Sequence, residues 1–117
     1  MELKIKRIYE KPDPDDGIRI LVDRLWPRGF TKEKAHIDIW VKEIAPTTEL
    51  RKWFGHDVAR WKEFREKFFL ELKDNTLQSD IIREQLKNNT VTLLYGAKDE
   101  AHNEAVVIKE FFNHQLS

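Results

Sequence analysis

Short runs of apolar residues alternate along the chain with longer stretches in which apolar residues recur every three or four positions. The short runs are rich in β-branched residues or alternate with polar ones, and they predict strands at residues 3–9, 18–22, 37–41 and 91–95. The longer stretches predict four helices, whose inward-facing residues run from Leu50 to Phe54, Val58 to Leu72, Leu77 to Leu86 and Ala101 to Phe112. We therefore expect an α/β fold, a single three-layer domain over residues 1–117 with about four mostly parallel strands and helices on both faces.

Two parts of this pattern admit a second interpretation. A helical crossover between parallel strands usually needs about a dozen residues or more. The connection between the first two predicted strands is shorter than that, so it favours a hairpin. A short 3₁₀ crossover would instead make these strands parallel. Residues 37–41 alternate as a strand does, which we favour, but Ile37, Trp40 and Ile44 would also share one face of a helix.

Residues with known capping preferences mark the ends of the predicted helices. Thr47 or Thr48 is expected to begin the helix that Gly55 ends in the left-handed region. The later helices are expected to be capped by the side chains of Asp57, Thr76 and Asp99.

The composition favours a soluble cytoplasmic protein and excludes several kinds of chemistry. The 117 residues include 21 basic and 21 acidic ones, and the resulting zero formal charge disfavours general binding to nucleic acid. The chain has no cysteine, and therefore no disulfide, thiolate metal site or cysteine nucleophile. No apolar run approaches the roughly 20 residues of a membrane span, and the first residues lack the apolar core of a signal peptide. Nothing in the composition indicates an oligomeric state.

Polar side chains follow two of the predicted strands at their carboxyl ends. Residues 23–29, Asp-Arg-Leu-Trp-Pro-Arg-Gly, follow the strand at 18–22, and a second polar group follows the strand at 91–95. Ligands bind at this edge in open α/β sheets, and cationic side chains there suit phosphate or carboxylate oxygens. We therefore expect catalytic roles for Asp23 and His102, and substrate-binding roles for Arg24, Trp26, Arg28, Lys98, Asp99 and Asn103.

Several of the predicted site residues also have a structural explanation. Asp23, at the end of a strand, could pair with an arginine or cap a turn. Asp99 could be a helix cap alone, and His102 could belong to the polar surface of the last helix.

Other polar motifs carry weaker signals. Residues 51–57 join basic and aromatic side chains that would suit a nucleotide, but a core helix and a turn explain all of them except His56. His36 and Asp38 are too few to predict a metal site. No phosphate-binding glycine loop or nucleophilic serine motif occurs, and we expect neither a metal nor a cofactor.

Several blocks of the chain resemble the YeaO-like branch of the DUF488 family. They are residues 21–29, 40–46, 50–57 and 91–95, with the pairs Lys98-Asp99 and His102-Asn103. The resemblance spans nearly the whole chain and implies a compact α/β domain with a strand at residues 37–41. It implies no role for the matching residues, because the family has no established function. Wider relatives carry a Cys-His-Arg cluster after the last strand, and without a cysteine here no thiol mechanism carries over.

The leading hypothesis is a small cytoplasmic protein that binds an anionic small molecule, such as a nucleotide or a phosphorylated metabolite. Whether it also acts on that molecule, as a hydrolase or a transferase, stays open. Arg24, Arg28 and Lys98 would hold the anion, and Asp23 or His102 would move a proton. The alternative is a non-enzymatic module that docks a protein or nucleic-acid partner through exposed aromatic and charged segments.

Overall fold

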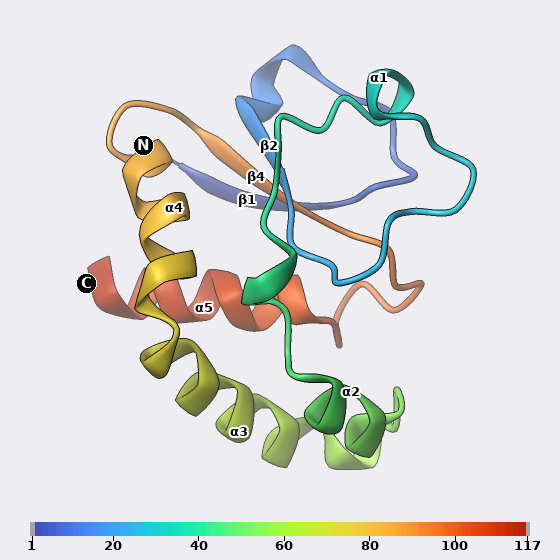
Figure 1. The fold of residues 1–117 in the computed structure, drawn as a ribbon, viewed down its shortest axis with the longest axis vertical. Coiled ribbons are helices and arrows are strands. Elements are labelled where there is room, and N and C mark those ends of the chain that lie inside the picture. Colours follow the sequence, from blue (N-terminus) through green and yellow to red (C-terminus); the bar gives the residue numbers. More distant parts are fainter. Residues whose placement is uncertain (1, 117) are drawn as a thin grey trace.

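A parallel sheet sets the architecture of the chain, for which a computed structural model describes residues 2–116, with side chains up to residue 114. The strands are β1 (Leu3–Arg7), β2 (Ile18–Leu21), β3 (Ile39–Trp40) and β4 (Val91–Tyr95). They lie in the order β1-β4-β2-β3, and each neighbouring pair is parallel (Figure 1). The expected α/β fold is confirmed. β3 is shorter than predicted because the chain turns at once into the 3₁₀ helix Lys42–Ile44.

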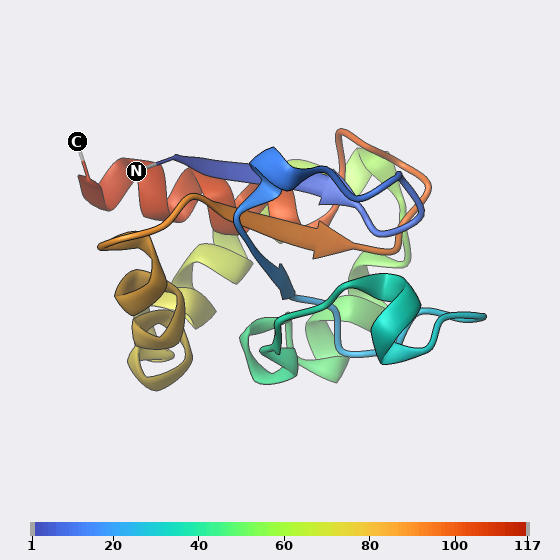
Figure 2. The ribbon, with the colours of Figure 1, turned by 90° about the horizontal axis from the view of Figure 1, so that it is seen from above.

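The hairpin interpretation of β1 and β2 is wrong, because β4 lies between these two strands. Both pair with β4 in parallel, as Figure 2 shows for β1 and β4. The connection contains the 3₁₀ helix Pro14–Asp16, as the second interpretation requires. Gly17 ends that helix at φ 67°, and a Cβ atom there would lie 2.1 Å from the carbonyl oxygen of Thr90. Only glycine therefore fits between this connection and the start of β4.

Helices cover the two faces of the sheet unequally. Four of them, α2 (Thr48–Phe54), α3 (Trp61–Asp74), α4 (Thr76–Leu86) and α5 (Glu104–Leu116), build the main core with one face. The other face packs against α1 (Lys32–Ala35) and the loop before it, in a smaller cluster that includes Leu21 and Leu94. Among residues 2–116, no helix is both long and apolar enough to cross a membrane.

Helix α2 begins and ends as its sequence predicts. The Thr47 hydroxyl accepts a hydrogen bond from the Leu50 N–H at 3.3 Å, and Gly55 ends the helix at φ 54°. Asp57 caps the 3₁₀ turn Val58–Arg60 that leads into α3, rather than α3 itself.

The two later caps differ from the prediction. Thr76 is the first residue of α4, and Asn75 before it makes no capping hydrogen bond with its side chain. Helix α5 begins at Glu104, not after Asp99, and the Asn103 side-chain oxygen accepts a hydrogen bond of 3.2 Å from an N–H of its first turn. A glutamate at the start of α5 thereby reaches the carboxyl edge of the sheet.

A buried charge network lies at the opposite, amino-terminal edge of the sheet. Asp16 pairs with Arg19 and accepts a hydrogen bond of 2.9 Å from Lys6. The Arg19 guanidinium also donates to the carbonyl oxygens of His36 and Ala35, at 2.9 and 3.1 Å. Burial raises the pKa of Asp16, but hydrogen bonds, from Lys6 first, hold it below the ordinary 3.8. The network joins the connection before β2 to the segment around α1.

Candidate functional site

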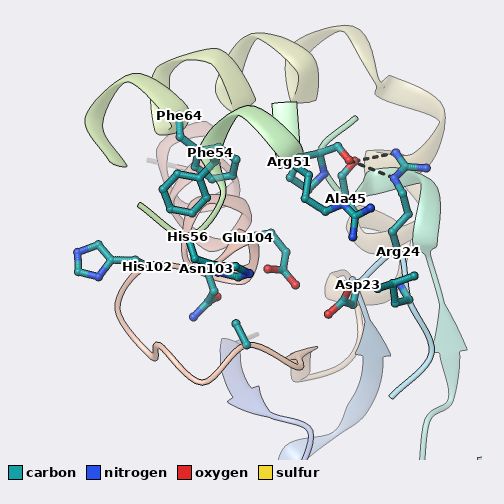
Figure 3. Close-up of a pocket in the computed structure, with 13 residues that line it drawn as sticks. Asp23, Arg24, Ala45, Arg51, Phe54, His56, Phe64, His102, Asn103 and Glu104 are labelled. Atoms are coloured by element: carbon teal, nitrogen blue, oxygen red, sulfur yellow. Dashed lines mark hydrogen bonds between the residues drawn. The ribbon is translucent and has the colours of Figure 1, made fainter. Parts of the chain in front are cut away.

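A cavity of about 170 Å³ lies at the carboxyl ends of β2 and β4, beside α2 and the start of α5 (Figure 3). Phe54 and Phe64 supply apolar walls. The polar residues that line the cavity are Asp23, Arg24, Arg51, His56, His102, Asn103 and Glu104. The fold thus brings four of the eight predicted site residues together here, and it adds three that were not predicted.

Two carboxyl groups point toward each other across the cavity, those of Asp23 and Glu104 (Figure 3). Burial, together with the nearby charge of Asp23, raises the pKa of Glu104 to about 8. Glu104 Oε1 is buried and has no hydrogen-bond partner among the described residues. Gly96 leaves room for this arrangement, since a Cβ atom there would lie only 3.2 Å from Asp23 Oδ2. Glu104 is therefore mostly protonated at neutral pH and can donate a hydrogen bond to a ligand.

The two arginines of the cavity differ in what they bind. Arg24 donates to the carbonyl oxygens of Pro46 and Ala45, each at 3.1 Å, and pairs with Glu43 at 3.2 Å. It fastens the end of β2 to the segment after β3. The Arg51 guanidinium instead points into the cavity, toward the two carboxyl groups (Figure 3). Within the described part of the chain, no hydrogen bond or ion pair engages the Arg51 side chain, so it is available to an anion.

The turn before α5 is held by its own polar side chains. Asp99 Oδ1 accepts from the N–H groups of Ala101 and His102, at 2.9 and 3.0 Å, and Oδ2 lies 2.9 Å from His102 Nδ1. These hydrogen bonds, the one from Ala101 first, lower the pKa of Asp99. The His102 ring packs edge-on against Trp61, with centroids 5.1 Å apart, and points away from the carboxyl pair (Figure 3). Asn103 Nδ2 donates to the Asp99 carbonyl at 2.9 Å, so both of its polar atoms are engaged.

His56 lies in the cavity wall, which the sequence left open. Gly55 and His56 both adopt the left-handed region, at φ 54° and 58°. For a residue with a side chain this conformation costs about 1 kcal/mol. It places the imidazole beside Phe54, with ring centroids 6.1 Å apart, at the mouth of the cavity.

Four predicted residues lie outside this cavity: Asp99, described above, and Trp26, Arg28 and Lys98. The Trp26 indole donates to the Phe30 carbonyl at 2.8 Å and packs against Trp40. Arg28 and Lys98 are exposed, and no hydrogen bond or ion pair engages either charged group in the described part of the chain. Trp26 and Arg28 line a neighbouring cavity instead.

Sequence reasoning missed Glu104 and Arg51 as site residues. One signal for Glu104 was present, because it lies three residues after Ala101 and four before Ile108, on the inward stripe of the last helix. A charged residue on an apolar stripe indicates either a buried partner or a site. Arg51 also had a signal, because it begins the basic and aromatic segment 51–57, but that segment was attributed to a core helix and a turn. Residues 2–116 contain no cluster of three or more metal-ligating side chains.

Comparisons with known proteins confirm the family that the sequence blocks indicate. A profile described as the inactive DUF488-N3 subclade matches residues 2–117. The uncharacterized protein YeaO of Escherichia coli K12 is 41% identical over 111 residues, which cover 95% of this chain and 96% of that protein. The uncharacterized protein Rv3073c of Mycobacterium tuberculosis H37Rv is 36% identical over 95% of this chain and 93% of its own length. No solved structure shows a significant match.

Proposed function

Because this chain belongs to the DUF488 family, in the subclade described as inactive, we propose that it binds a small anionic molecule without transforming it. The observation that carries the proposal is the Arg51 guanidinium, which points into a cavity and has no partner among the described residues. Arg51 is exposed, but its guanidinium lines the same cavity as Glu104, whose Oε1 is buried and has no hydrogen-bond partner among the described residues. An anion would satisfy both groups at once.

The two carboxyl groups support an anionic ligand rather than oppose it. Burial, and after it the charge of Asp23, keeps Glu104 protonated, and a protonated carboxyl group donates a hydrogen bond to an anionic oxygen. Arg51 supplies the balancing positive charge. In this proposal Asp23 helps burial to keep the proton on Glu104, and the His102–Asp99 pair braces the turn, so neither Asp23 nor His102 moves a proton in a reaction.

The size of the cavity limits what it can enclose. Its volume, about 170 Å³, is close to that of a cavity of about 150 Å³ known to hold benzene. The enclosed part of the ligand is therefore a phosphate or carboxylate with a few further atoms, and a whole nucleotide does not fit inside.

Calorimetric titration with inorganic phosphate, acetate and phenyl phosphate tests the proposal. Arg51→Gln should weaken binding by about tenfold or more, the usual effect of losing one charged hydrogen bond. Lys52→Gln is the matched control, since it removes an exposed cation of the same helix that lines neither this cavity nor the neighbouring one and has no partner among the described residues. Equal effects of the two substitutions would contradict the assignment of Arg51.

The sign of proton exchange near pH 8 gives a second, independent test. An anion should favour protonated Glu104, so binding should take up protons and weaken as the pH rises through about 8. Release of protons when acetate, which does not itself titrate near pH 8, binds would refute the proposal. Absence of binding by all three probes would also refute it and would leave the interaction-module hypothesis.

A further inference from the structure

We propose that a second cavity extends this site and that the ligand is an anion joined to a flat apolar or aromatic group. The inference rests on the proposed anion site and deepens it by naming the rest of the ligand. The second cavity has a volume of about 250 Å³ and lies where β1, β4 and β2 end, with Ile8, Gly96 and Asp23 in its lining. The two cavities share Asp23 and Leu25, so they adjoin along one wall.

Aromatic and aliphatic side chains line most of the second cavity. Tyr9, Leu25, Trp26 and Pro27 contribute to it, and Arg28 supplies a cation. Such a lining suits a ring system far better than it suits a second anion or a sugar.

Both aromatic rings are held in place before any ligand binds. The Tyr9 ring lies 4.6 Å from the Arg7 guanidinium carbon and 5.2 Å, between centroids, from Phe30. The Trp26 ring lies 5.2 Å from that of Trp40, and its N–H donates to the Phe30 carbonyl. Rigid walls lower the entropy cost of ordering a site when a ligand arrives.

The wall between the cavities carries apolar surface that nothing in the described chain covers. Leu25, which lines both cavities, is 61% exposed, and Tyr9, which lines the second cavity only, is 43% exposed. The backbone of Leu25 is fixed, because its N–H donates to Asp23 Oδ1 at 3.2 Å. A ligand that passes from one cavity to the other must lie against Leu25 and would remove its side chain from water.

The combined dimensions indicate the ligand class. Cavities of about 170 and 250 Å³ together fall in the range of sites for small organic molecules, roughly 300–1,000 Å³. The anionic group would lie with Arg51 and Glu104, and the ring would lie between Tyr9 and Trp26. An aryl or heteroaryl phosphate or carboxylate has this chemistry, and a nucleoside monophosphate is one source of it.

Titration with inorganic phosphate and phenyl phosphate, under the same conditions, tests the extension. Phenyl phosphate should bind at least about tenfold more tightly, since its ring buries apolar surface on both partners. Leu25→Ala should lower the affinity for phenyl phosphate about fivefold or more and leave the affinity for inorganic phosphate unchanged. Leu70→Ala is the matched control, because Leu70 is also 61% exposed but lines neither cavity, and it should change neither affinity.

The outcomes separate this inference from the proposed function on which it rests. Phosphate binding that depends on Arg51, with no gain for phenyl phosphate, would overturn the extended ligand and keep the anion site. The extended ligand would also be overturned if Leu25→Ala lowered the affinities for both probes equally, because the Leu25 side chain would then affect binding in the first cavity alone. Failure of both probes to bind would overturn the anion site and the extension together.

Discussion

Replacing Glu104 by glutamine removes a buried carboxyl group, and we expect the variant to be more stable than the wild type in alkaline solution. The pKa of this group is 4.5 in the unfolded chain and about 8 in the folded protein. The folded state therefore retains a proton that the unfolded state releases. The contribution of this bound proton to the stability of the folded state is complete below pH 4.5 and is lost as the pH rises through about 8.

The pKa values give the size of the effect. At about 1.4 kcal/mol for each pH unit, the interval from 4.5 to about 8 corresponds to a loss of about 5 kcal/mol. This is an upper limit, because the cavity opens to solvent and water that enters it stabilises the ionised form. Glu104→Gln keeps the shape and cannot ionise, so the stability difference between variant and wild type should grow by about 2–4 kcal/mol between pH 5 and pH 9.

Urea unfolding followed by tryptophan fluorescence, at steps between pH 5 and pH 9, measures this difference. The wild type and Glu104→Gln share all other titrating groups, so the contributions of those groups to the pH dependence of stability cancel in the difference. Glu66→Gln is the matched control, since Glu66 is exposed on α3 and its stability difference should not vary with pH. A difference for Glu104→Gln that is equally flat would refute the burial argument, and with it the protonated donor of the proposed site.

Three further substitutions test the packing that positions the site, each by urea unfolding. Asp16→Asn should cost about 3 kcal/mol at pH 7, because it leaves the buried Arg19 without its counter-charge. The stability difference between wild type and Asp16→Asn should disappear as the pH falls below 3.8 and the wild-type carboxylate becomes protonated. A difference that persists at low pH would contradict the ion pair. Ser79→Ala should stabilise the protein by about 1 kcal/mol, since the Ser79 hydroxyl is buried without a hydrogen-bond partner among the described residues. A destabilised variant would show instead that the hydroxyl has a hydrogen-bond partner. Gly17→Ala should cost about 3 kcal/mol or more, because its Cβ would clash with the Thr90 carbonyl, and a neutral result would show that the connection can move.

Much of the local structure follows from the sequence alone. The run at residues 91–95 predicts β4 with its observed bounds, and Gly55 adopts the left-handed conformation its position requires. The strand predicted at residues 18–22 is β2, although it ends at Leu21, one residue earlier than predicted. These predictions hold because strand alternation, helical spacing and glycine geometry depend on a few neighbouring residues.

The tertiary structure decided the order of the strands and the partners of the polar side chains. Inserting β4 between β1 and β2 needs pairing across more than 70 residues, for which the β1–β2 connection gives no signal. The sequence favoured Arg24 over Arg51 as an anion-binding residue, yet Arg24 binds carbonyl oxygens of the segment after β3 and Arg51 faces the cavity. Glu104 acquires its raised pKa only because folding removes it from water and, to a smaller extent, brings it near the charge of Asp23. A side chain's chemistry depends on its neighbours in space, and those are set by the packing of distant segments.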